Sequence, residues 1–149
     1  MASEERNAIG AFIASIITFI YFGTPIWRKT QAGAYSGDEG LVSWAHDVLW
    51  LMGGGIVIGI VVMIAFHILL SIITNNPSPE MITDERDRMI GRRGTLITLV
   101  IASAGFIAAI VMLAVGWGAI AALNTILVGM ALGSTISEIQ KMVYYRFGI

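Results

Sequence analysis

Two histidines, His46 and His67, are the side chains best suited to hold a metal or a haem in this 149-residue sequence, which contains no cysteine. On one helix their spacing places them about 31 Å apart along the axis and about 60° apart around it. One chain therefore cannot use both for a single metal or haem. Two haems would fit if each lay between equivalent histidines of a dimer or a partner, as in transmembrane cytochromes. In the simpler alternative, His67 is a hydrogen-bonded packing residue and His46 an interfacial one, and a proton-linked role is a third.

Other polar side chains are scarce within the apolar stretches of the sequence. Asp47 lies between Trp44 and Trp50, which indicates headgroup depth, and Asn124 could form a hydrogen bond between helices. Polar residues in lipid are candidates for function, so Asp47, His67 and Asn124 form our intramembrane polar set. The sequence offers no nucleophile paired with a base. We therefore predict that the chain is not an enzyme and holds no cofactor, with bound lipid left open.

The amino-acid composition indicates the environment in which these residues lie. Hydrophobic residues make up 56% of the chain and charged residues only 13%, about half the usual share. So few polar side chains cannot coat a soluble globule of this size. A net charge of −1 also lacks the basic surface that nucleic-acid binding needs.

Four apolar segments are each long enough to cross a bilayer core of about 30 Å as a helix. They predict an all-α fold, a single membrane domain over residues 1–149 with four transmembrane helices in a compact bundle. The predicted spans are residues 8–27, 44–73, 94–115 and 118–136, with a loop at 74–93 and a helical extension at 137–149.

The basic residues predict the orientation of these spans. Seven lie on one side and two, Arg28 and Lys29, on the other. Because cytoplasmic loops carry the excess of Lys and Arg, both termini and the 74–93 loop should be cytoplasmic. The expected location is the cytoplasmic (inner) membrane of a prokaryote. The seven are Arg6, Arg86, Arg88, Arg92, Arg93, Lys141 and Arg146.

Small residues on two spans predict how the helices associate. In lipid there is no hydrophobic driving force between helices, so they associate through close approach of their backbones, which glycine permits. The second span carries the pair Gly55 and Gly59. On the fourth span, four small residues fall within about 80° of one another. These residues, Ala122, Gly129, Gly133 and Ser137, form a packing face either within the bundle or between copies of a homo-oligomer.

The predicted loop ends in a charged segment that runs directly into the third span. Its acids come first and its bases last, which suits the start of a helix, and Asp84 with Arg88 would form an i,i+4 pair. The simpler interpretation is a solvated helix start with arginines that set the topology. The alternative is a docking or regulatory element. Its charged residues are Asp84, Glu85, Arg86, Asp87, Arg88, Arg92 and Arg93.

This charged motif resembles that of small four-span bacterial and archaeal membrane proteins of unknown function. The resemblance rests on the run from Asp84 to Asp87, followed by Ile90 and a basic pair at the mouth of a span. A Glu/Arg-rich start and Tyr21-Phe22 near the end of the first span add to it. It implies the four-span fold and no particular activity.

Three functions are consistent with these features. We expect a non-enzymatic membrane protein that acts as a homo-oligomeric, accessory or regulatory subunit through helix packing and its charged loop, with membrane lipids and other membrane subunits as partners. The alternatives are a pore formed by oligomerisation and a haem-binding membrane subunit. A transporter is disfavoured because the spans carry no carboxylate near the midplane.

Overall fold

The computed structural model describes residues 3–37, 39–74 and 85–147, and within these ranges every regular element is helical. Four stretches are long and apolar enough to cross a membrane: Arg6–Gln31, Gly40–Ile73, Glu85–Ala114 and Ala119–Phe147. The prediction of an all-α chain with four candidate membrane helices is confirmed, and it indicates an integral membrane protein. The elements are α1 (Ser3–Thr18), η1 (Phe19–Gly23), α2 (Thr24–Gln31), α3 (Gly40–Thr74), α4 (Glu85–Ala114) and α5 (Ala119–Phe147).

Two helices extend well beyond the predicted spans. The charged segment that begins at Glu85 is already part of α4, because Glu85 and Asp87 stabilise the positive end of the helix dipole. At the other end of the chain, α5 continues to Phe147 without a break. No glycine or proline interrupts the sequence between Gly133 and Phe147 to stop it.

The first span contains a local π-helix at Phe19–Gly23, directly before Pro25. The backbone N–H of Thr24 bonds to the carbonyl of Phe19, five residues back, and the Thr24 hydroxyl donates to the carbonyl of Ile20. These bonds accommodate a proline that has no N–H to donate and whose ring would clash with the preceding turn. Helix α2 can therefore continue the span to Gln31.

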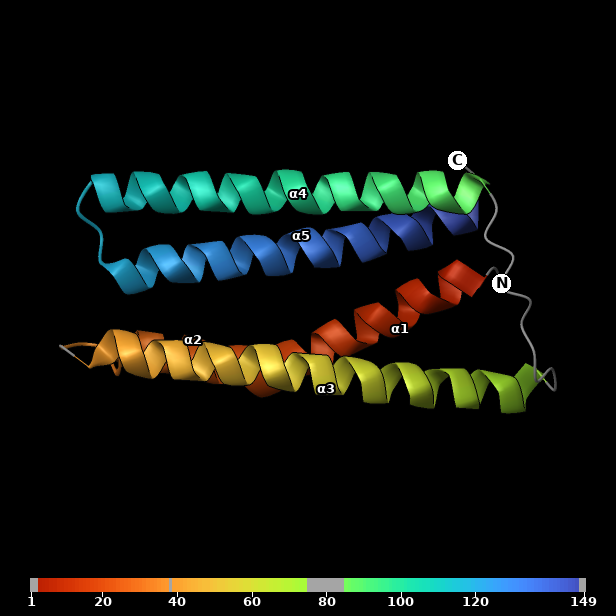
Figure 1. The fold of residues 1–149 in the computed structure, drawn as a ribbon, viewed down its shortest axis with the longest axis horizontal. Coiled ribbons are helices and arrows are strands. Elements are labelled where there is room, and N and C mark those ends of the chain that lie inside the picture. The colour runs from red at the N-terminus through yellow and green to blue at the C-terminus, as the bar shows by residue number, and fades with distance from the viewer. Residues whose placement is uncertain (1–2, 38, 75–84, 148–149) are drawn as a thin grey trace.

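Helices α4 and α5 form an antiparallel hairpin with a very short turn (Figure 1). Gly116 has a φ of 84°, which suits glycine at the end of a helix. The backbone N–H of Trp117 donates to the carbonyl of Met112 over 2.9 Å and closes the last turn of α4. The predicted antiparallel pairing of the last two spans follows from this turn.

Helix α1 links the two halves of the molecule. It packs against α3 near η1 and slants across to α5 at its own beginning (Figure 1). The beginnings of α1 and α4 and the ends of α3 and α5 lie together, and we call this the terminal end. The opposite end, which holds residues 32–37 and 115–118, is called the turn end.

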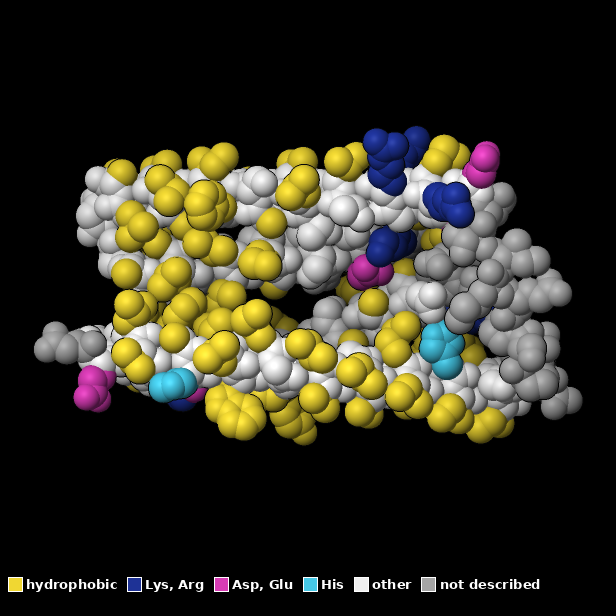
Figure 2. All heavy atoms as spheres, in the orientation of Figure 1, with side chains coloured by type: hydrophobic (Ala, Val, Ile, Leu, Met, Phe, Trp, Pro, Cys, Tyr) yellow, Lys and Arg dark blue, Asp and Glu magenta, His cyan; other side chains and the backbone are white. Residues whose placement is uncertain are grey.

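The four helices were predicted to form a compact bundle, but little of their apolar surface is buried within the described ranges. In the described ranges, only nine hydrophobic residues are buried, and none of the most apolar stretch of α3 is buried. Figure 2 shows hydrophobic side chains over the outer faces of both halves and a hollow between them. A buried hydrophobic cluster lies at the turn end and consists of Ile26, Tyr35, Trp44 and Val48. Close packing is otherwise concentrated between α4 and α5, where the small residues are.

Candidate functional site

An ion pair with a third partner fastens α2 to α3 at the turn end. The Nζ of Lys29 lies 2.7 Å from Oδ2 of Asp47, and the Tyr35 hydroxyl donates to the same oxygen over 2.6 Å. Tyr35 is only 6% exposed and belongs to the loop between the two helices. Asp47, predicted as an intramembrane polar candidate, is therefore a structural acceptor shared by a helix and a loop.

The Tyr35 hydroxyl stays protonated in this arrangement. Burial raises its pKa well above its usual value, and the hydrogen bond to Asp47 and the negative charge of that carboxylate raise it further. A neutral phenol is the form that can donate to Asp47. The loop is therefore held to α3 under alkaline as well as neutral conditions.

A second hydrogen-bonded group at the turn end joins three helices. The indole Nε1–H of Trp44 donates to Oδ1 of Asn124 over 2.8 Å, and Nδ2 of Asn124 donates to Oγ1 of Thr30 over 3.0 Å. Asn124 thus bonds across helices to both α3 and α2. Together with the bonds of Asp47 to Lys29 and Tyr35, these hydrogen bonds connect α2, α3, α5 and the 32–37 loop at the turn end.

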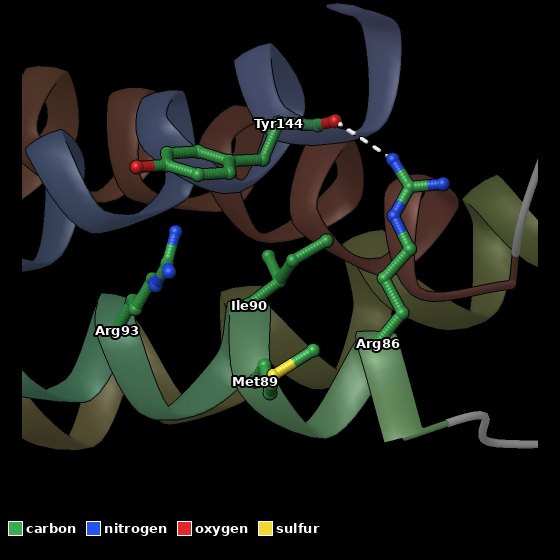
Figure 3. Close-up of a pocket in the computed structure, with 5 residues that line it drawn as sticks. All are labelled: Arg86, Met89, Ile90, Arg93 and Tyr144. Carbon is green, nitrogen blue, oxygen red and sulfur yellow. Dashed lines mark hydrogen bonds between the residues drawn. The ribbon is translucent and has the colours of Figure 1, made fainter. Parts of the chain in front are cut away.

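At the terminal end, two arginines of α4 and one tyrosine of α5 line a pocket of about 250 Å³. An Nη of Arg86 donates to the Tyr144 carbonyl over 3.3 Å, and the Arg93 guanidinium lies 5.4 Å from the centre of the Tyr144 ring. Figure 3 shows Tyr144 spanning the distance between the two guanidiniums, with Ile90 and Met89 between them on α4. Ile90 is buried and forms an apolar base.

Of the other predicted loop residues, Asp87 lies at the contact between α4 and α5. Tyr145 donates to Asp87 over 2.9 Å, which ties α5 to the start of α4 a second time. Arg88 and Arg92 are exposed, as is Glu85. Asp84 lies outside the described residues. From Glu85 to Arg93 the charged segment is helical, and Arg86 and Asp87 contact the C-terminal part of α5.

The predicted small-residue face of α5 lies against α4 of the same chain. Ala122, Gly129, Gly133 and Ser137 are all buried. A Cβ added to Gly129 would lie 3.0 Å from the Cα of Gly105. This face is filled within the hairpin, so it does not face a second copy.

The glycine pair of α3 is less closely packed. A Cβ on Gly55 would meet the methyl group of Thr18 at 3.1 Å, whereas one on Gly59 would have no atom within 4 Å. Beside this pair, an apolar groove of about 500 Å³ runs between η1 and α3. Helix α3 therefore has open space beside Gly53 and Gly59, but not beside Gly54, where an added Cβ would overlap the ring of Phe22.

The two histidines lie at opposite ends of α3 (Figure 2). The ring of His67 makes an edge contact with Phe66, with centroids 6.3 Å apart, and His46 is exposed. Over the residues that are described, no three His, Asp or Glu side chains come together in a metal-binding group. Within the described part of the chain, neither histidine belongs to such a group.

Several residues of these sites are not apparent from the sequence. Lys29 was counted only as a charge that sets the topology, and Tyr35 and Tyr144 were not candidates for a polar site. A usable signal existed for Lys29 and Asp47, since opposite charges on consecutive helices near the same membrane surface are expected to pair. No comparable signal marked Tyr144. Comparisons with protein families, curated proteins and solved structures found no match to this chain.

Proposed function

We propose that this chain is a non-enzymatic subunit of a membrane assembly, formed from copies of itself or as the accessory or regulatory subunit of a larger complex. In this proposal it lies in the cytoplasmic membrane of a prokaryote, with both termini and the charged start of α4 in the cytoplasm. Helix α3 supplies the surface that contacts other subunits, and the charged start of α4 supplies a surface for regulation.

The proposal rests mainly on the exposure of α3, whose apolar surface is not covered by the rest of the chain. Its most apolar window has a mean hydropathy of 3.0, and none of that window is buried within the chain. Val61, Ile64 and Ile68 are 56–58% exposed and recur at the i, i+3, i+7 spacing that places them on one helix face. This face lies away from α1, whose Gly10 faces Met63.

The α4–α5 hairpin and helix α3 differ in how closely they are packed, which supports separate roles for them. The α4–α5 hairpin is closely packed and its small-residue face is filled. Helix α3, in contrast, is held by α1 and by the polar bonds at the turn end. A helix with one fastened end and a long free apolar face is well placed to receive a helix of another subunit.

Cysteine cross-linking tests the proposal, and the absence of native cysteine makes the background clean. Single variants V61C, I64C and I68C are oxidised in native membranes. Two copies related by a twofold axis bring equivalent positions of a shared face together. We expect disulfide-linked dimers, or adducts with a second protein through a thiol-reactive cross-linker, at these three positions.

The variant M63C is the matched control, because Met63 faces α1 of its own chain. Little or no adduct is expected there. Equal adduct yields at all four positions would indicate random collision. Such a result, or the absence of adducts along the whole face, would overturn the assembly role of α3.

A further inference from the structure

Two guanidinium groups converge on one pocket at the terminal end, and among the described residues no carboxylate forms an ion pair with either of them. Arg86 and Arg93 are seven residues apart, which places them within about 20° of each other on α4 and about 10.5 Å apart along its axis. Over the described residues, neither lies within ion-pair distance of an acid. Their contacts are with the carbonyl and the ring of Tyr144.

Neither of the two described acids at the start of α4 lines the pocket. Glu85 and Asp87 lie about 100° to either side of Arg86 around the helix. The carboxylate of Asp87 accepts the hydroxyl of Tyr145. The described residues that line the pocket include two arginines and no acid, so positive charge dominates it, and Tyr144 contacts both guanidiniums (Figure 3).

The pocket lies where the charged and apolar parts of α4 meet. From Gly94 to Ala114 the helix carries no charged residue, so Arg93 marks the boundary of the hydrocarbon and Arg86 lies two turns further out. Between them, Met89 and Ile90 provide apolar surface. A ligand that matches this pocket has a phosphate group that binds the two arginines and an apolar portion that packs against Met89 and Ile90.

We propose that this pocket binds the phosphate-containing headgroup of an anionic phospholipid. Arginine binds phosphate through paired N–H donors, and basic pockets beside membrane helices are suited to such headgroups. The same chemistry would accept a free phosphate ion, but the boundary position and the apolar base favour the lipid. This inference rests on the α4–α5 pair and is independent of the proposed role of α3.

The test is a count of retained lipids by native mass spectrometry. The full chain is purified in a neutral detergent and titrated with phosphatidylglycerol or with phosphatidylcholine. We expect one tightly held phosphatidylglycerol per chain and no comparable phosphatidylcholine. In R86Q/R93Q, the apparent affinity for phosphatidylglycerol should fall by at least about tenfold, because charge-assisted hydrogen bonds are lost.

The matched control is R88Q/R92Q, which removes the same charge from two arginines of α4 that do not line the pocket, and it should keep the lipid. Equal losses in both double variants would show unspecific attraction and overturn the proposal. Displacement of the lipid by inorganic phosphate at comparable concentration would overturn the assignment to a lipid. If R86Q/R93Q fails to fold, R86K/R93K keeps the charge without the paired donors. Wild-type affinity in that variant would contradict the proposed arginine geometry.

Discussion

The substitution Gly129→Ala tests whether α4 and α5 cross with their backbones in direct contact. The added Cβ would lie 3.0 Å from the Cα of Gly105 and 3.5 Å from the carbonyl oxygen of Ile101. The reciprocal substitution at Gly105 would place a Cβ 2.9 Å from the Cα of Gly129. Both neighbours are backbone atoms of a rigid helix, so no side-chain rotation relieves the overlap.

The size of the effect follows from these distances. Carbon atoms pack favourably at about 3.5–4.0 Å, so the helices must separate by roughly 0.5–1 Å at this point. Separation also lengthens the 3.2 Å bond from the Thr98 hydroxyl to the Gly133 carbonyl. Overpacking of this kind costs about 1–3 kcal/mol. The better helix propensity of alanine offsets at most about 1 kcal/mol of this cost. We therefore expect the free energy of unfolding to fall by about 1–2 kcal/mol.

The assay is reversible unfolding by SDS in mixed micelles, followed by circular dichroism. Gly53→Ala is the matched control, because a Cβ on Gly53 meets no atom within 4 Å and the residue lies inside α3. That variant should have unchanged or slightly higher stability. If G129A and G53A unfold with the same free energy, the close backbone crossing of α4 and α5 is refuted.

Two further predictions concern the turn end. Asn124→Leu removes the acceptor of the buried Trp44 indole and the donor to Thr30, so the free energy of unfolding should fall by about 1–2 kcal/mol in the same assay. Ser134→Ala, which loses only a bond within α5, should have almost no effect, and equal losses would contradict the role of Asn124. In the folded protein the raised pKa keeps Tyr35 protonated between about pH 9 and 11. Tyr35→Phe should therefore not change the gain in tyrosinate absorbance that is measured over this pH range. In the unfolded chain Tyr35 would ionise at about pH 10. The stability that its bonded hydroxyl contributes is therefore fully present below about pH 10 and is lost progressively as the pH rises from there towards the raised pKa of the folded state. A smaller absorbance gain in the variant than in the wild type would show that Tyr35 titrates normally.

The helices themselves could be predicted from the sequence, because a run of about 20 apolar residues has few alternatives to a membrane helix. The small-residue face of α5 could also be predicted, since Gly129 and Gly133 are one turn apart. What could not be predicted was its partner, because the same pattern suits a neighbouring helix and a second copy equally. The 115–118 turn decides between them by placing α4 directly beside α5.

The polar sites depend on the tertiary arrangement, and sequence spacing alone does not provide it. Asn124 was expected to bond across helices, but its partner Trp44 is 80 residues away in the chain. Tyr144 becomes part of a pocket only because α5 continues without a break beside the start of α4. The tilt of α1 depends in turn on the π-helix before Pro25, which apolar periodicity does not reveal.

The central claim is that this chain works as a subunit of a membrane assembly. The most direct measurement is the number of copies and companion proteins in particles extracted from native membranes with a nanodisc-forming polymer, without detergent. The account predicts particles that contain at least two copies of the chain, or one copy with a second membrane protein in fixed ratio. Particles with a single chain and no companion protein at every expression level would contradict it.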